Sequence, residues 1–176
     1  MCVPPFFACS GDDLNLSYSL AGVNRKCEKI KQFVLTENMQ VCDGDVKTAV
    51  IKLMKFKECV GNIGMDIHYL TAHLAKDFLQ KKHRVTINID KPSGSAGLDI
   101  ESDNIVAEIK TTIPYQPHDF GATQKREITK DLERLSISDA PNKYFFIIDD
   151  NTERILKSKY MTQYPTVKVV NLLREV

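Results

Sequence analysis

The stretch GLDIESDNIVAEIK constrains the fold more than any other part of the chain. Two apolar runs, residues 98–101 and 105–112, flank the polar tip Ser-Asp-Asn, and this pattern predicts a β-hairpin. Three charges interrupt it, because Asp99, Glu108 and Lys110 occupy positions where a half-buried sheet favours Val or Thr. The elements around the hairpin must show what these charges do.

The chain after position 62 alternates helix and strand patterns, as is typical of an α/β fold. A continuous apolar run at residues 143–148 predicts a central strand. We therefore expect a mixed β-sheet flanked by helices. Helices are expected at residues 63–82, 122–135 and 152–160, and strands at residues 84–89, 98–101, 105–112, 143–148 and 166–172.

The first part of the chain has a different character. All five cysteines lie within residues 1–61, which also contain two amphipathic helical patterns, at residues 23–35 and 46–60. The cysteines form no C-x-x-C pair and their number is odd, so free thiols are favoured over disulfides or structural zinc. We expect an N-terminal helical region, residues 1–61, that serves recognition or dimerisation, and a core at residues 62–176.

The composition is that of a compact soluble protein: 43% of the 176 residues are hydrophobic and 27% are charged. The net charge of +1 indicates no global basic field, so a nucleic-acid partner must be held by a local patch. No apolar run approaches the ~18 residues of a membrane span, and the start of the chain lacks the basic region of a signal peptide. We expect a cytoplasmic protein with no membrane partner.

The three charges of the hairpin can meet in space. Residues two apart in a strand share a face, so Glu108 and Lys110 point to one side while Ile109 faces the opposite core. Asp99 falls about opposite Ala107 across the hairpin, and therefore next to Glu108. Neighbouring carboxylates repel each other without a cation, and carboxylate oxygens with water are what Mg²⁺ requires. The cluster indicates a metal site, in which Lys110 places a water or neutralises an oxyanion on phosphorus.

A simpler interpretation is a surface hairpin on which Lys110 only pairs with Glu108. Such an exposed ion pair contributes about 0 to 1 kcal/mol. We favour the metal site, because the three charges lie on an otherwise apolar hairpin.

Asp99, eight intervening residues and then Glu108-Ile109-Lys110 resemble the motif of the PD-(D/E)XK nuclease superfamily. The expected elements of residues 63–172 are also similar to its restriction endonuclease-like core, with the order αβββαβ. The resemblance implies that Asp99 and Glu108 are ligands of Mg²⁺, for which Mn²⁺ substitutes, and that the Ile109 carbonyl joins them. It also implies that Lys110 is the catalytic lysine, which positions or activates the attacking water.

Two departures from the family pattern keep alternatives open. Many members carry a Glu on the first core helix, whereas residues 63–82 contain none, so the number of metal ions is open and a catalytically degenerate module stays possible. An exonuclease-like branch has a Gln and a Tyr one turn apart on the next helix. Gln124 is present, but Ile128 takes the place of the Tyr, which disfavours a processive exonuclease.

Five residues are candidates for contacts with nucleic acid. Ser93 and Ser95 precede Asp99 in a loop that can offer hydroxyls and backbone N–H groups to a phosphate, although an ordinary turn explains them equally well. Three further candidates open the helix at residues 122–135, although the acids nearby favour a solvated helix face there. They are Gln124, Lys125 and Arg126.

The resemblance implies a Mg²⁺-dependent endonuclease that hydrolyses phosphodiester bonds of double-stranded DNA, foremost a restriction endonuclease of the type II kind. Cutting both strands of a palindrome requires two sites related by a two-fold axis, so we expect a homodimer. The alternatives are a structure-selective nuclease, of the Holliday-junction resolvase or repair type, and a module that binds nucleic acid without cutting it.

Overall fold

The computed structural model describes residues 11–36, 46–89 and 97–175. The chain divides into two compact units, Met1–Asp66 and Ile67–Val176. Ser93 and Ser95, which are predicted to contact nucleic acid, lie outside the described residues.

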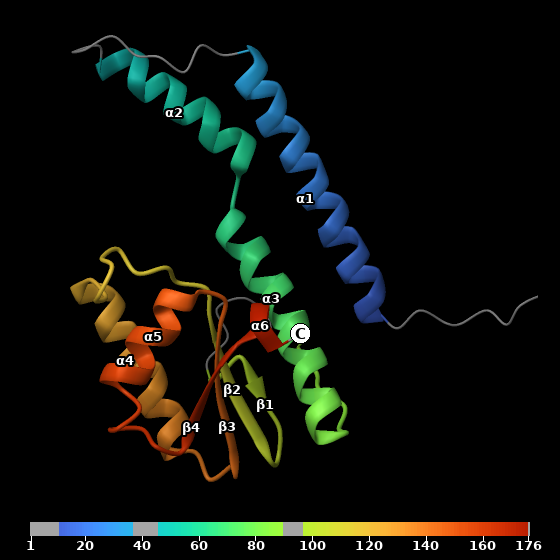
Figure 1. The fold of residues 1–176 in the computed structure, drawn as a ribbon. Helices are drawn as coiled ribbons and strands as arrows, with labels where there is room; N and C mark the ends of the chain where they lie inside the picture. The colour runs from blue at the N-terminus through green and yellow to red at the C-terminus, as the bar shows by residue number, and fades with distance from the viewer. Residues whose placement is uncertain (1–10, 37–45, 90–96, 176) are drawn as a thin grey trace, which may run out of the picture. The chain divides into compact units, whose positions relative to one another are not determined.

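The first unit is built from helix α1 (Gly11–Thr36) and helix α2 (Val46–Val60) (Figure 1). They pack through Phe33, which is buried and whose ring centroid lies 5.7 Å from that of Phe56. Helix α2 ends at Val60, and the following Gly61 adopts a left-handed φ of 59° and donates its N–H to the Lys57 carbonyl in the last turn at 2.8 Å. The bounds of α2 agree with the amphipathic pattern, whereas α1 begins earlier than the sequence predicts.

The second unit contains a four-stranded sheet with the order β1-β2-β3-β4 (Figure 1). Its strands are β1 (Ile100–Glu101), β2 (Ile105–Lys110), β3 (Asn142–Ile147) and β4 (Val167–Asn171). Helix α3 (Ile63–His83) begins in the first unit, and α4 (Ala122–Ile137), α5 (Asp150–Lys159) and α6 (Leu172–Glu175) lie in the second. β1 pairs antiparallel with β2, and β2, β3 and β4 run parallel, which confirms the predicted α/β class with a mixed sheet.

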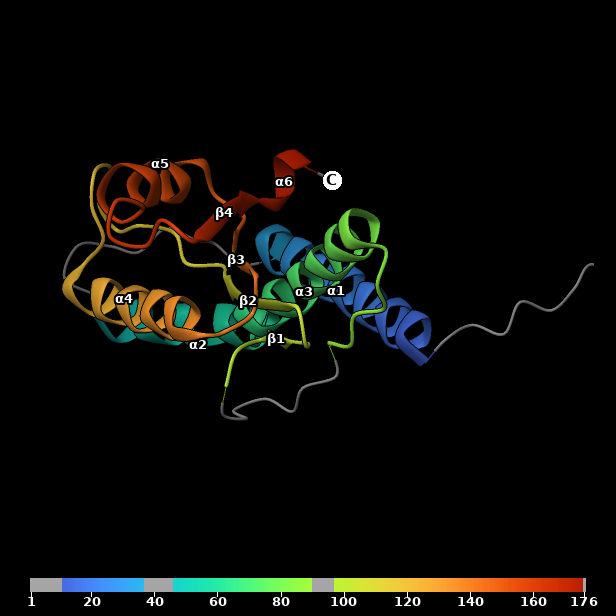
Figure 2. The same cartoon turned by 90° about the horizontal axis from the view of Figure 1, so that it is seen from below.

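Helices cover both faces of the sheet (Figure 2). Helices α4 and α5 pack on the face that carries Val106 and Phe145. Helices α3 and α6 pack on the face that carries Ala107 and Phe146. Phe145 and Phe146 are fully buried on opposite faces of β3, as the continuous apolar run in this strand predicts.

The predicted strand at residues 84–89 is wrong, because none of the four strands in the described part of the chain includes these residues. Arg84 leaves α3 with a left-handed φ of 56°. Ile87 is nevertheless only 2% exposed, and Ile89 packs against the same core cluster. The alternating pattern therefore reflects burial of one side of the segment without sheet pairing. The sequence predicts a three-stranded meander after α3, but only the hairpin of β1 and β2 forms, because residues 84–89 do not pair.

Candidate active site

Strand β2 directs its charged side chains towards helix α4. The Glu108 carboxylate and the Lys110 ammonium both contact side chains of α4, whereas Ile109 is buried in the core on the opposite face. This alternation agrees with the predicted period of two. The fold therefore brings Glu108 and Lys110 to one layer of the molecule, between the sheet and α4.

Asp99 lies immediately before β1 and one residue away from its predicted position. Ile100, not Asp99, is opposite Ala107, and β1 begins at Ile100, so it is shorter than the predicted strand. The Asp99 carboxylate instead accepts a hydrogen bond from the backbone N–H of Ile109 at 2.7 Å (Oδ2 to N). This bond fixes Asp99 beside the backbone that carries Glu108.

Lys110 does not pair with Glu108. Its Nζ forms an ion pair with the carboxylate of Asp131, a residue of α4 that is only 3% exposed. The other oxygen of Asp131 accepts a hydrogen bond from Arg134 at 2.6 Å (Oδ1 to Nη2). Asp131 thus lies between two cations, and the simple Lys110–Glu108 pair considered above is not formed.

Arg134 connects α4 to the hairpin at two points. Its Nη2 donates to Glu108 Oε1 at 3.1 Å, and its Nη1 donates to the carbonyl oxygen of Gly97 at 2.9 Å. Glu108 Oε2 is buried and has no hydrogen-bond partner among the described residues. Buried polar atoms are nearly always paired, so this oxygen is available to a hydrogen-bond donor or a cation.

The pKa of Glu108 is raised from 4.5 to about 7. Burial is the largest cause, and the carboxylates of Asp99 and Asp131 raise the pKa further. Arg134 and Lys110 act in the opposite direction and only partly compensate. A cation close to Glu108 Oε2 would favour the charged carboxylate.

His68 of α3 also reaches the site. Its Nε2 lies 3.8 Å from Asp99 Oδ1, and its side chain is 44% exposed. A neutral imidazole can bind a metal, and a protonated one can contact a phosphate. The sequence offers no signal for this residue, because position 68 belongs to a helix whose side facing Asp99 depends on tertiary packing.

The residues suit a hard divalent cation by their chemistry. Within the described part of the chain, no three His, Cys, Asp or Glu side chains converge as a ready metal site. However, Glu108 Oε2 has no partner and the neighbouring Asp99 supplies a second carboxylate, and Mg²⁺ is commonly held by one or two carboxylates and several waters. The site also holds three carboxylates, with Asp131 as the third, against the two cations Lys110 and Arg134. A cation would offset the excess of negative charge.

The candidates on α4 for nucleic-acid contacts already have intramolecular partners. Gln124 Oε1 accepts from the backbone N–H of Gly121 at 3.0 Å, and its Nε2 donates to the Ile113 carbonyl at 2.9 Å. Lys125 forms an ion pair with Asp119 at 2.7 Å, and Arg126 approaches Glu127 at 3.4 Å. Gln124 therefore has a structural role, whereas the exposed Lys125 and Arg126 can exchange these partners for a phosphate at small cost.

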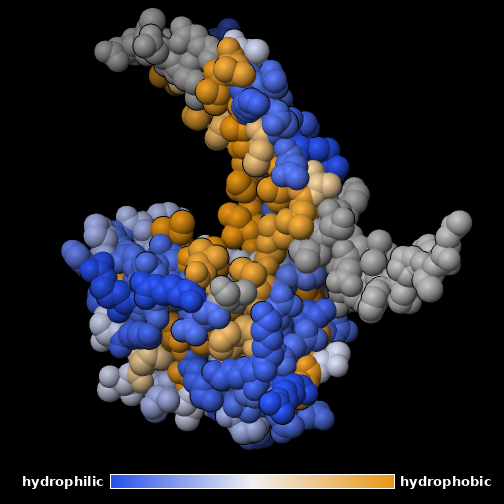
Figure 3. Space-filling view, turned by 45° about the vertical axis from the view of Figure 1, so that its right-hand side comes forward, coloured by the Kyte–Doolittle hydropathy of each residue, from blue (hydrophilic) through white to orange (hydrophobic). Residues whose placement is uncertain are grey.

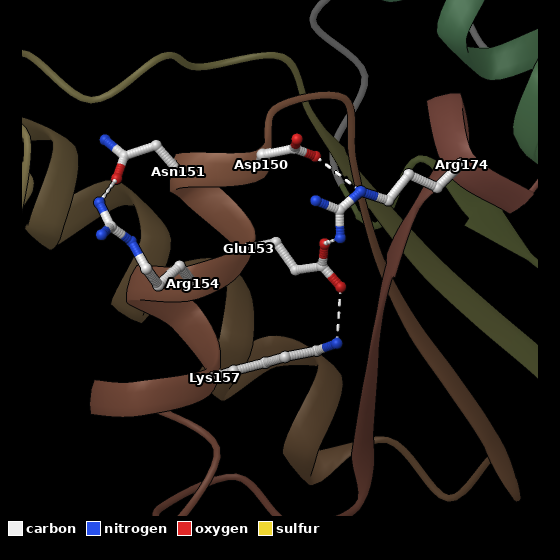
Figure 4. A pocket seen from close by; sticks show the side chains of 6 residues that line it. All are labelled: Asp150, Asn151, Glu153, Arg154, Lys157 and Arg174. Atoms are coloured by element: carbon white, nitrogen blue, oxygen red, sulfur yellow. Dashed lines mark hydrogen bonds and ion pairs between the residues drawn. The ribbon is translucent and has the colours of Figure 1, made fainter.

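A separate pocket of about 470 Å³ lies at the ends of β3 and β4 (Figure 4). It is lined by Asp150, Asn151, Glu153, Arg154, Lys157 and Arg174. Arg174 pairs with both Asp150 and Glu153, and Lys157 pairs with Glu153 at 2.6 Å. Arg154 donates instead to Asn151 and to the carbonyl of Pro117. All three cations of the pocket therefore already have partners, whereas Glu108 Oε2 has none among the described residues.

Comparisons with models of protein families, with curated proteins and with solved structures found no match. Among the described residues, none of the helices combines the length and the apolar character that a membrane crossing requires. A proposal about function must therefore rest on the site itself.

Proposed function

We propose that the protein is a Mg²⁺-dependent endonuclease that hydrolyses phosphodiester bonds of DNA, as a type II-like restriction endonuclease of the PD-(D/E)XK superfamily. The observation that carries the proposal is the buried Glu108 Oε2, which has no partner in the described part of the chain and lies on the hairpin with Asp99 and Lys110. The same three residues carry the resemblance in the sequence.

Each residue has a role in this proposal. Asp99 and Glu108 hold the cation, the carbonyl of Ile109 joins them, and His68 lies close enough to Asp99 to assist. The cation, when bound by these residues, would supply Lewis-acid chemistry to the phosphate and to a water. Lys110 supplies a positive charge and three donors, which orient that water and offset the charge that develops on phosphorus.

DNA is held locally in this proposal. The net charge of +1 gives the chain no general affinity for a polyanion, so a few exposed cations must provide the phosphate contacts. Lys125 and Arg126 at the start of α4 are exposed and supply such contacts. A weak general affinity fits an enzyme that selects its site by sequence.

The test is cleavage of supercoiled plasmid DNA of mixed sequence in Mg²⁺ and in EDTA, with Lys110→Ala in parallel. We expect discrete fragments that require the metal, and a rate at least ~100-fold lower for Lys110→Ala. Glu133→Gln, which changes an exposed charge on α4, is the matched control and should cut like the wild type. Preferential cutting of branched DNA would instead identify a structure-selective nuclease.

A degenerate module that binds nucleic acid without cutting it is the second candidate. It is favoured by the ion pairs that already engage Lys110 and one oxygen of Glu108. In that case neither plasmid nor branched DNA is cut, while DNA binding persists.

We also propose a homodimer, held by helix α2. Figure 3 shows apolar surface along the helices of the first unit, and α2 contributes Val46, Val50, Leu53 and Met54, all at least 49% exposed. Lys47 and Glu58 flank this stripe on one side, about three helical turns apart. Antiparallel pairing with a second copy places each Lys47 near the Glu58 of the other chain, whereas parallel pairing opposes like charges.

A further inference from the structure

Arg134 and Asp131 are one turn apart on α4 and contact Glu108, Lys110 and the backbone of Gly97. Arg134 donates to Glu108 Oε1 and to the carbonyl that precedes Leu98 and Asp99, while Asp131 holds Lys110. Both acids that Arg134 contacts are buried: Glu108 is 7% exposed and Asp131 is 3% exposed. Charged hydrogen bonds in such surroundings are stronger than at the surface and fix geometry.

We propose that Arg134 and Asp131 are positioning residues of this site: Arg134 occupies Glu108 Oε1 so that Oε2 is presented to the cation, and Asp131 orients the Lys110 ammonium. The inference rests on the proposed metal site and deepens it. Neither residue touches the reacting atoms.

Arg134 suits its role because its guanidinium is planar and forked. Nη1 donates to the main-chain oxygen of Gly97. This bond helps to fix the plane of the guanidinium from which Nη2 donates to Glu108. In this arrangement Arg134 holds Glu108 by Oε1 alone and leaves Oε2 without a partner among the described residues. Partners of this kind, behind metal-binding carboxylates, typically affect metal affinity or activity 10- to 100-fold.

Asp131 acts on the other group. Lys110 has a long flexible side chain, which would sample many rotamers without a fixed partner. Asp131 holds it on the α4 side of β2, and Arg134 in turn holds Asp131 at 2.6 Å. The two roles are separable, because Arg134 serves the cation and Asp131 serves the lysine.

The test measures Mn²⁺ binding by calorimetry and single-turnover cleavage under saturating metal. We expect Arg134→Met to raise the dissociation constant for Mn²⁺ about 10-fold or more, and Arg134→Lys, which keeps the charge without the fork, to recover only part of it. Asp131→Asn should bind Mn²⁺ within about 3-fold of the wild type and cut about 10- to 100-fold more slowly. Glu133→Gln on the same helix is the control.

A double variant separates positioning from structural support. If Asp131 acts through Lys110, then Asp131→Asn added to Lys110→Ala should lower the rate no further, whereas a general structural role would add its own loss. Melting temperatures show whether each variant is folded. Additive losses, or Mn²⁺ affinity that Arg134→Met leaves unchanged, would overturn the inference.

The metal-binding measurement also distinguishes the inference from the proposed function. A wild type that binds Mn²⁺ but cuts no DNA contradicts the nuclease, while weaker binding by Arg134→Met still supports the role of the arginine. A wild type that cuts DNA together with an unaffected Arg134→Met contradicts the inference alone. A wild type that neither binds Mn²⁺ nor cuts contradicts both.

Discussion

Burial of a charged carboxylate with one unpaired oxygen costs free energy. In Glu108 this cost appears as a raised pKa, because burial favours the protonated form. Its pKa of about 7 means that the side chain is half protonated near neutral pH when no cation is bound. A divalent cation replaces that proton, so metal binding at this residue should release protons.

The raised pKa makes stability depend on pH. Because the folded chain binds this proton more tightly than the unfolded chain, the free energy of unfolding should fall as pH rises from about 4.5 to 7 and should then level off. The contribution of Glu108 is on the order of 1 to 3 kcal/mol. Denaturant unfolding in EDTA between pH 5 and pH 8 should show this decline, and Glu108→Gln should remove that part of it.

Other groups titrate in the same range, so the comparison is between variants. Glu133→Gln, whose side chain is exposed, should follow the wild-type curve. Mg²⁺ at pH 8 should stabilise the wild type and leave Glu108→Gln almost unaffected. Parallel pH curves for Glu108→Gln and the wild type would show that Glu108 has an ordinary pKa.

The residues of the hairpin were predictable from the sequence, but their partners were not. Asp99, Glu108 and Lys110 stand out because charges interrupt a strand pattern. Asp131 and Arg134 lie on a helix that is rich in charges, where a solvated face is the default expectation. Only the packing of α4 against β2 shows that these two charges point inwards.

At the scale of elements, the start of helix α4 is held to the preceding loop by side-chain hydrogen bonds. Gln124 ties the incoming loop to the first turn, because it accepts from Gly121 and donates to Ile113. Gln124→Ala should therefore lower the free energy of unfolding by about 1 kcal/mol. Its effect on DNA affinity should be smaller than that of Lys125→Ala, as measured by unfolding and by DNA titration.

Thr123→Ala provides the control, since Thr123 is an exposed neighbour in the same turn. The outcome that contradicts this assignment is a Gln124→Ala variant of wild-type stability with strongly reduced DNA affinity. Gln124 would then contact DNA, as expected from its position at the start of this helix in the sequence.

Elements with a strong pattern were predicted well, and those that depend on pairing were not. β3 contains the buried apolar run from Tyr144 to Ile147 and is one of the two internal strands, and α4 has a clear apolar stripe of Ile128, Leu132 and Leu135. Residues 84–89 show the same alternation as a strand, but periodicity reports which side is buried and not whether the backbone is paired. The predicted position of Asp99 opposite Ala107 was wrong by one residue for a similar reason, since the register of β1 depends on its pairing with β2.

At the scale of the whole molecule, the apolar stripe on α2 should decide the oligomeric state. Leu53 belongs to this stripe, lies about midway between Lys47 and Glu58 and is 65% exposed, so Leu53→Glu would place two charges near the two-fold axis of the proposed dimer. We expect the wild type to sediment as a dimer and this variant to dissociate at least ~100-fold more readily. Sedimentation equilibrium over a range of concentrations measures both.

Leu35→Glu is the matched control, because Leu35 is 71% exposed on α1 and lies outside the stripe. It should remain dimeric. A wild type that is monomeric at every concentration, or equal effects of the two substitutions, would contradict a dimer through α2.

The mixed sheet also has a consequence for the order of folding. The β1–β2 hairpin is closed by a short tip, so Asp99 and Glu108 can meet early through local contacts. The parallel pairing of β2 with β3 must wait for the crossover that contains α4, and Arg134 arrives only with that helix. We therefore expect the docking of α4 to be the step that commits the chain to its native state, since it brings the countercharge that two adjacent carboxylates need.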